Sequence, residues 1–242
     1  MTVTMSAPVR APTRAAGNAC STCEARRLSV CDAIPLNDLA RLARVAEGDV
    51  AKPRTAFIEE GEPADSFFNI SSGTARIYKL LSDGRRQITG FAKAGDFLGL
   101  AVSETYAFSA EAIDTVRYCQ FSREKLHALI DDFPAMEKRL MKVASSELVA
   151  AQEQMLLLGR KNARERLASF LIALSPAAPR LPLLPMTRGD IADYLGLTIE
   201  TISRTMTKLR GEGLIDYSDA TELTIRDRGA LRSLADGTPR SQ

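Results

Sequence analysis

Four cysteines are the residues of this chain whose type and spacing suggest chemistry. Cys20, Cys23 and Cys31 form a C-x2-C-x7-C pattern near the N-terminus, and the fourth is Cys119. Thiolates in such a pattern suit zinc or an iron–sulfur cluster, and spacing alone does not separate the two because both accept four cysteines. A metal site shared with Cys119 would tether the N-terminal segment, so loss of the metal would free it. The plain alternative is four unrelated structural cysteines.

The composition limits the kinds of partner and compartment. The chain has 242 residues, 45% of them hydrophobic, with 32 basic and 30 acidic residues and a net charge of +2. A DNA-binding surface would therefore have to be local. No run reaches the roughly 18 apolar residues of a membrane helix, and the first 19 residues lack the apolar core of a secretory signal. We therefore expect a cytoplasmic protein, in which clustered thiols favour a metal or redox site over disulfides.

The segments around the cysteines predict a small sensor domain. Residues 1–19 are short, polar and proline-containing, which is typical of a disordered tail. In residues 20–133 the cysteine loop is followed by short alternating runs between Lys52 and Phe121, separated by Gly, Asp and Pro. Strands joined by tight turns at this spacing predict a small antiparallel barrel or roll.

A long helix is predicted next, over residues 134–160. Pro134 suits the first turn of a helix, and the following stretch has no Gly or Pro until Gly159. An apolar stripe at near-heptad spacing predicts that this helix pairs with a second copy of itself. The dimer-interface residues expected from it are Leu140, Val143, Leu148, Ala151 and Met155. The alternative is that the stripe only covers the barrel.

Residues 161–242 predict a separate DNA-binding domain. Ile191, Ala192 and Leu195 form one apolar face, Gly196 permits a tight turn, and Thr198 can cap a second helix. This arrangement is typical of a helix-turn-helix, in which the second helix would turn Ile199, Ile202 and Met206 inward. A two-stranded wing is predicted over residues 214–217 and 223–225. The alternative is an ordinary helical hairpin with a solvated charged face.

The outward side chains of the second helix could read bases. They are Glu200, Thr201, Ser203, Arg204 and Lys208. Arginine can pair with guanine through two hydrogen bonds, serine can bond a base or a phosphate, and glutamate can accept from the cytosine amine. These residues stand near the helix N-terminus, the part that enters the major groove in this motif.

Three stretches of the chain resemble the CRP/FNR superfamily of bacterial transcription regulators, and its FNR branch in particular. They are SGTARIYKLLSDGRRQITGFAKAGDFLGL from Ser72, LLLGRKNARERLASFL from Leu156 and MTRGDIADYLGLTIETISR from Met186. The resemblance covers essentially the whole chain after Cys20. It implies an α+β fold: an N-terminal antiparallel β-roll like that of cyclic-nucleotide-binding domains, a long dimerisation helix and a C-terminal winged helix-turn-helix.

The same resemblance implies a function. Proteins of the FNR branch bind palindromic DNA as homodimers and usually activate transcription when oxygen is scarce. Glu200, Ser203 and Arg204 occupy the places of the E-x-x-S-R base-reading motif. The implied target is TTGAT-N4-ATCAA, and the turn from Ser82 to Arg86 lies where this family meets RNA polymerase.

The sensed signal is predicted from the same comparison. Cyclic-nucleotide binders neutralise the phosphate with an arginine in R-S-A, whereas Phe108 precedes Ser109 and Ala110 here, so cyclic nucleotide is not expected. His127, the one histidine, is interpreted as structural rather than as a haem ligand. The FNR branch holds an oxygen-labile 4Fe–4S cluster on four cysteines, which implies that Cys20, Cys23, Cys31 and Cys119 are ligands.

The gap between the second and third cysteines departs from the best-known pattern of that branch. That pattern has five residues in the gap, and this chain has seven, as in FnrN, FnrL and oxygen-sensing FixK-type regulators of alphaproteobacteria. A zinc-stapled regulator of the same fold that senses another signal is the alternative. A thiol redox enzyme is not predicted, because the CxxC has no thioredoxin-like context and no dinucleotide fingerprint or catalytic constellation is present.

Overall fold

The computed structural model describes residues 13–14, 20–100, 104–174, 180–181, 184–217 and 223–237. The expected disordered tail, residues 1–19, lies outside them except for the short strand β1 (Thr13–Arg14), which pairs with Gly48 and Glu47. Within the described residues no helix is both long and apolar enough to span a membrane.

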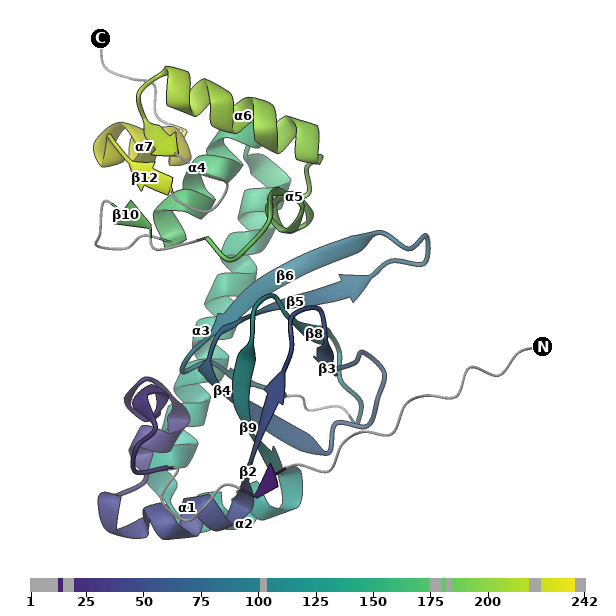
Figure 1. Ribbon diagram of the computed structural model, residues 1–242, viewed down its shortest axis with the longest axis vertical. Helices are drawn as coiled ribbons and strands as arrows, with labels where there is room; N and C mark the ends of the chain where they lie inside the picture. Colours follow the sequence, from purple (N-terminus) through teal and green to yellow (C-terminus); the bar gives the residue numbers. More distant parts are fainter. Residues whose placement is uncertain are drawn as a thin grey trace, which may run out of the picture.

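Two antiparallel sheets form the sensor domain (Figure 1). One sheet has the order β1-β2-β9-β4-β7 and the other β3-β8-β5-β6. The strands besides β1 are β2 (Ala46–Ala51), β3 (Ala56–Ile58), β4 (Ser66–Ser72), β5 (Thr74–Leu80), β6 (Arg86–Lys93), β7 (Phe97–Leu98), β8 (Ser109–Ala112) and β9 (Val116–Ser122). Side chains alternate between the faces of each strand, so each sheet turns one row toward the other. Ile58, Ile70, Ala75 and Val116 are among the residues buried between the sheets.

The cysteine segment covers the other face of the first sheet together with three helices. It consists of η1 (Glu24–Leu28), η2 (Val30–Ala33) and η3 (Leu36–Asp38), and continues into α1 (Leu39–Val45). α2 (Arg123–Asp132) and the first half of α3 (Pro134–Arg160) complete this layer. Val30, Phe97, Phe121 and Met136 lie in its core. The N-terminal segment is therefore part of a packed layer and not an appendage.

Helix α3 connects the two ends of the molecule (Figure 1). It begins at Pro134, in the first helical position, and ends at Arg160. These bounds coincide with those expected for the long helix. Only two of its side chains, Met136 and Leu157, are buried in the described chain.

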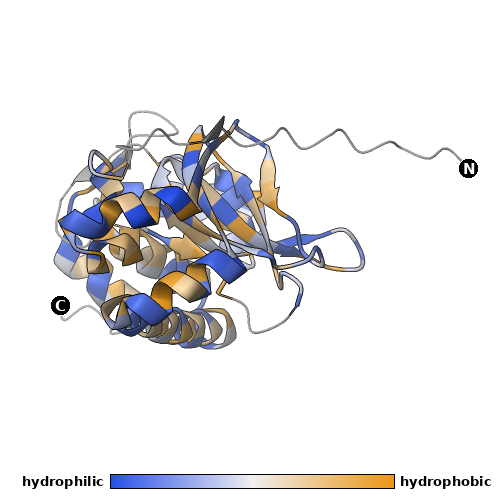
Figure 2. Cartoon of the chain, turned by 90° about the horizontal axis from the view of Figure 1, so that it is seen from below, coloured by the Kyte–Doolittle hydropathy of each residue, from blue (hydrophilic) through white to orange (hydrophobic). Residues whose placement is uncertain are grey.

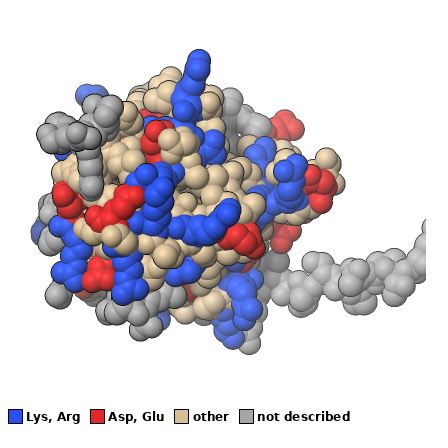
Figure 3. All heavy atoms as spheres, turned by 90° about the horizontal axis from the view of Figure 1, so that it is seen from above, with Lys and Arg blue, Asp and Glu red and all other residues tan. Residues whose placement is uncertain are grey.

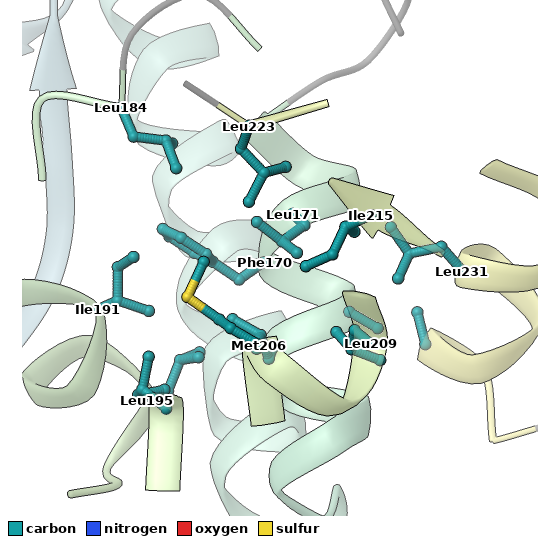
Figure 4. Packing of buried hydrophobic residues seen from close by; sticks show 14 of the residues in the cluster. Phe170, Leu171, Leu184, Ile191, Leu195, Met206, Leu209, Ile215, Leu223 and Leu231 are labelled. Carbon is teal, nitrogen blue, oxygen red and sulfur yellow. The ribbon is translucent and has the colours of Figure 1, made fainter. Parts of the chain in front are cut away.

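The C-terminal domain packs around a single apolar cluster. Its elements are α4 (Ala163–Leu174), β10 (Arg180–Leu181), α5 (Arg188–Leu195), α6 (Ile199–Gly211), β11 (Ile215–Tyr217), β12 (Leu223–Ile225) and α7 (Arg228–Ala235). Figure 4 shows Met206 and Leu209 of α6 directed toward Phe170 and Leu171 of α4. β10 adds a third strand to the expected wing, in the order β10-β12-β11. The predicted α+β architecture of roll, long helix and winged helix-turn-helix is confirmed.

Hydropathy follows this arrangement. Figure 2 shows hydrophobic and hydrophilic residues mixed along most helices, as expected for elements with one buried and one solvent-facing side. α3 departs from the pattern because several of its large apolar residues are exposed.

Candidate DNA-binding surface and cysteine cavity

Helices α5 and α6 form the helix-turn-helix. Thr187 caps α5 in a reciprocal box with Asp190, and Gly196 ends the helix in the left-handed conformation with φ of 61°. Thr198 then caps α6 by accepting a hydrogen bond from the Thr201 N–H at 3.2 Å. These local bonds satisfy backbone groups that helix ends leave unpaired. The residues of the turn and of the adjoining helix ends therefore specify its conformation locally.

The three predicted base-reading residues lie along the solvent-facing side of α6. Glu200 and Arg204 are exposed, and Ser203 is half-buried. Residues three and four apart share a helix face, so the three side chains can enter one groove together. Hydrogen bonds from its own backbone N–H and from Thr198, with the charge of Arg204, lower the pKa of Glu200. Glu200 therefore remains an acceptor at neutral pH.

Basic side chains surround this helix. The Nη1 of Arg188 lies 3.3 Å from Ser203 Oγ, and Arg188 and Arg210 both stack over the ring of Tyr217, at 5.7 and 4.9 Å. Figure 3 shows Lys and Arg side chains on this end of the molecule with acidic groups between them. Such a mixed surface suits local phosphate contacts, which position a protein on DNA.

One expectation for α6 is wrong. Ile199 was expected to face inward, but it is 52% exposed. It occupies the first position of the helix and is near Gly189, where no side chain exists to cover it. Ile202 and Met206, one and two turns further on, are buried as expected.

A polar clamp joins the β-roll to α5. Arg76 of β5 is within 2.5 Å of Asp190, and it also pairs with Glu111. Arg86 of β6 bonds Asp193 at 2.8 Å and approaches Asp190 at 3.3 Å. Burial pushes the pKa of Asp190 upward, but hydrogen bonds from Thr187 and the charge of Arg76 outweigh it, so the pKa lies below its ordinary value of 3.8.

The two arginines of the Ser82 to Arg86 turn differ in their surroundings. Arg85 has a side chain 76% exposed, whereas that of Arg86 is only 26% exposed because it turns back to α5. The turn also presents Leu80 and Leu81 to solvent, at 60% and 42% exposure. Arg85 is therefore exposed at the tip, where it pairs with Asp83 at 2.7 Å, and Arg86 belongs to the clamp.

All four cysteines line one cavity. It has a volume of about 570 Å³ and lies between the cysteine segment and the β2-β9-β4 face of the first sheet. Cys31 is buried, while Cys20, Cys23 and Cys119 are half-buried. The structure thus brings together the three N-terminal cysteines and the distant one, as the site prediction requires.

The thiols influence one another electrostatically. Burial raises the pKa of Cys31 to about 12, and the neighbouring Cys119, Cys20 and Cys23 add to the rise, although a hydrogen bond with Ser29 opposes it. Burial, with Cys20 and Cys23, likewise raises the pKa of Cys119 to about 11. The chain alone therefore keeps these two thiols protonated, so a cationic metal group would have to displace their protons as it binds.

The spread of the cysteines bears on which group they fit. One zinc ion holds four sulfurs at about 2.3 Å, which brings them to within about 3.8 Å of one another. Among the described residues, no three His, Cys, Asp or Glu side chains gather tightly enough to hold one metal ion. A cluster that offers a separate iron to each thiolate needs a wider arrangement. Four thiols around one cavity supply the donors that either group requires.

The expected dimer-interface residues divide between two surroundings. Leu148 and Met155 are exposed, at 62% and 67%, and Ala151 is also exposed. Leu140 and Val143 instead pack partly against the apolar cluster that contains Val30 and Cys31. Met141, at 66% exposure, continues the exposed row in their place. α3 therefore touches the cysteine segment on one side and leaves an apolar row open on another.

The interior of the roll is filled by aromatic rings. Phe57 stacks on Tyr118 with centroids 4.8 Å apart, and Phe68 contacts both at 5.8 and 5.6 Å. Phe108 packs partly against the same cluster. His127 is exposed on α2, beside Phe67.

A roll joined through a long helix to a helix-turn-helix with an exposed reading face defines a DNA-binding transcription regulator. Residues 50–133 match the model of the cyclic nucleotide-binding domain, and residues 165–234 that of the Crp-like helix-turn-helix domain. The chain is 46% identical over 206 residues to the transcriptional activatory protein AadR of Rhodopseudomonas palustris, covering 82% of this chain and 86% of that protein.

Two further comparisons agree. The nitrogen fixation regulation protein FixK of Bradyrhizobium diazoefficiens is 45% identical over 209 residues, covering 82% of this chain and 86% of that protein. The structure of FixK2 from Bradyrhizobium japonicum superposes with a TM-score of 0.75 at 36% identity, covering 82% of this chain and all of that one. The chain belongs to the CRP/FNR family of transcription regulators, which are not enzymes.

Two features of the site were not anticipated from the sequence. The Arg76–Asp190 pair joins residues far apart in the chain, and Asn69 contributes a buried amide to the cysteine cavity. A signal for Asn69 was present, since a lone amide interrupts the apolar run Phe67, Phe68 and Ile70.

Proposed function

We propose that the protein is an oxygen-responsive transcription activator that holds a 4Fe–4S cluster on Cys20, Cys23, Cys31 and Cys119. The observation that carries the proposal is the shared cavity of the four cysteines, one wall of which is the cysteine segment that packs against α3. When bound, the cluster supplies an oxygen-labile link between the cysteine segment and β9. Because the protein binds DNA, we expect it to act in the cytoplasm.

The cysteine segment is positioned to control α3. η2, which contains Cys31, packs against the first half of α3, where Leu140 and Val143 share its apolar cluster. The same helix carries the exposed row of Met141, Leu148 and Met155 at seven-residue intervals. A repeat of seven is the signature of a helix that pairs with a copy of itself. Holding or releasing the segment would shift the population of the paired helix.

As a homodimer the protein would present two copies of α6 to successive major grooves. We infer a target of the form TTGAT-N4-ATCAA, read by Glu200, Ser203 and Arg204. Arg204→Ala should relax discrimination at the half-site guanine by about 1–3 kcal/mol while leaving the fold intact. Titration of base-substituted sites measures this, and an unchanged base preference would contradict the assignment.

Two further partner assignments belong to the proposal. The tip of the β5–β6 hairpin, with exposed Leu80, Leu81 and Arg85, is assigned to RNA polymerase. Cyclic nucleotide is rejected as a ligand, because Phe108 stands where a cation would neutralise the phosphate and aromatic rings fill the roll.

Anaerobic purification tests the cofactor. The proposal expects iron and acid-labile sulfide in about equal amounts, with visible absorbance that bleaches in air together with loss of DNA affinity. Cys119→Ala should purify without the cluster and bind the palindrome weakly under either atmosphere. Stoichiometric zinc without sulfide would instead establish a zinc-stapled regulator that senses another signal.

A further inference from the structure

Asn69 lies directly beside Cys119 in the first sheet. In the pairing of β4 with β9 the two residues face each other, and Gly48 of β2 faces Cys119 from the other side. Opposed residues in a sheet direct their side chains to the same face, with Cβ atoms about 4.5–5.5 Å apart. Asn69 and Cys119 both line the cysteine cavity. Gly48 adds no side chain, so the amide is the cross-strand neighbour of this thiol.

The Asn69 amide is buried without a partner for its oxygen. The residue is 2% exposed, and its Oδ1 accepts no hydrogen bond. Phe67, Phe68 and Ile70 on either side of it are buried and apolar. A buried amide among apolar neighbours is costly unless it has a partner, and no hydrogen bond to Oδ1 holds the amide in its present orientation. The terminal amide torsion is broad, which lets either end of the group turn toward the cavity.

Several other polar side chains at or beside the cavity are already engaged in hydrogen bonds. The Tyr118 hydroxyl donates to Asp49 at 3.2 Å, and the Ser71 hydroxyl donates to the Arg117 carbonyl at 3.0 Å. Ser29, which lies against Cys31, donates to the Arg26 carbonyl at 3.0 Å. Because Asn69 faces Cys119 directly in the strand pairing, its amide is well placed to donate a hydrogen bond to the sulfur of Cys119.

We propose that Asn69 is a positioning residue that donates an N–H to the Cys119 thiolate and strengthens its hold on the cluster. The inference rests on the proposed function, because it needs the thiolate form. A donor to a ligating sulfur favours its charged form and orients it, as outer-shell partners do for metal ligands. Cys119 is the one proposed ligand that lies on the sheet, so the cluster links the N-terminal segment to the sheet through this residue. The strength of the bond between Cys119 and the cluster therefore sets how readily the segment is released.

Asn69→Leu tests the proposal, since it keeps the number and branching of the side-chain heavy atoms and removes the donor. We expect the variant to take up the cluster but to lose it to an iron chelator, without oxygen, about tenfold faster than the parent protein, the scale of outer-shell effects. The frequency of the iron–thiolate stretch should also shift. Ile70→Val is the matched control: it changes the next residue of β4, which faces the roll interior, and should leave the loss rate unchanged.

Thermal unfolding of the metal-free proteins separates this role from a merely structural one. Asn69→Leu should be as stable as the parent or more stable, because it removes an unsatisfied buried group. A variant that loses both apo stability and cluster together would overturn the proposal. Asn69→Asp, almost isosteric with the parent, places a carboxylate beside the thiolate and should lose the cluster faster still.

The outcomes distinguish this proposal from the function on which it rests. A parent protein that holds zinc, or no sulfide, defeats the proposed function. A parent that holds the cluster, beside an Asn69→Leu variant that loses it at the same rate, defeats only the assignment of Asn69.

Discussion

Asp190 should contribute more to stability than its single position on α5 suggests. It accepts hydrogen bonds from the Thr187 N–H and hydroxyl at 2.9 and 2.7 Å and pairs with Arg76 across the domain boundary. Asp190→Ala removes the reciprocal half of the capping box with Thr187, worth about 1 kcal/mol. It also removes a buried charge-assisted bond, worth about 1.5–3 kcal/mol. The expected loss in the free energy of unfolding is about 2.5–4 kcal/mol. No cost of an unpaired Arg76 is added, because Glu111 remains to pair with it.

Urea unfolding at pH 7, with hydrogen exchange of the α5 amides, measures this loss. The pH dependence has a definite sign. The folded-state pKa of Asp190 lies below its ordinary 3.8, so its contribution is fully present above that value. It disappears as the pH falls through the lowered folded pKa, and the difference between the parent and Asp190→Ala should narrow below about pH 4.

Asp193→Ala is the matched control. Asp193 stands one turn further along α5 and pairs with Arg86, but its side chain is 33% exposed. A pair open to solvent contributes about 0–1 kcal/mol. The reasoning about the buried clamp is wrong if Asp190→Ala lowers the free energy of unfolding no more than Asp193→Ala does. It is also wrong if the loss caused by Asp190→Ala does not change on acidification.

Two further predictions concern α3 and the cysteine segment. Leu148→Glu should weaken the proposed dimer at least about tenfold in sedimentation while thermal stability stays unchanged, because Leu148 is 62% exposed in the single chain; an unchanged dimer would remove α3 from the interface. Gly95→Ala should increase proteolysis of residues 20–33, since a Cβ there would lie 2.6 Å from the Leu28 Cβ. Gly61→Ala has a similar φ, +90° against +97°, with open space around it, so equal proteolysis in the two variants would exclude the Leu28 contact as the cause.

The cysteine site shows how far sequence reasoning reached. Ligand chemistry, together with the resemblance to the FNR branch, predicted a shared site for Cys20, Cys23, Cys31 and Cys119, and the structure places all four around one cavity. The register that sets Asn69 beside Cys119 joins strands separated by many residues, and no local pattern specifies it. The helical periodicity did not predict that Leu140 and Val143 pack against the cysteine segment. The apolar stripe is wide enough to contact both that segment and a second copy of the helix.

The sequence by itself determined the local elements of this protein. Pro134 starts α3, Gly196 and Thr198 shape the turn between α5 and α6, and Glu200, Ser203 and Arg204 share one helix face because helix geometry depends on near neighbours. Only the tertiary structure decided which distant groups meet: Asn69 with Cys119, and Arg76 with Asp190. Such pairs depend on strand register and domain packing, which are determined by the packing of the whole chain and not by neighbouring residues.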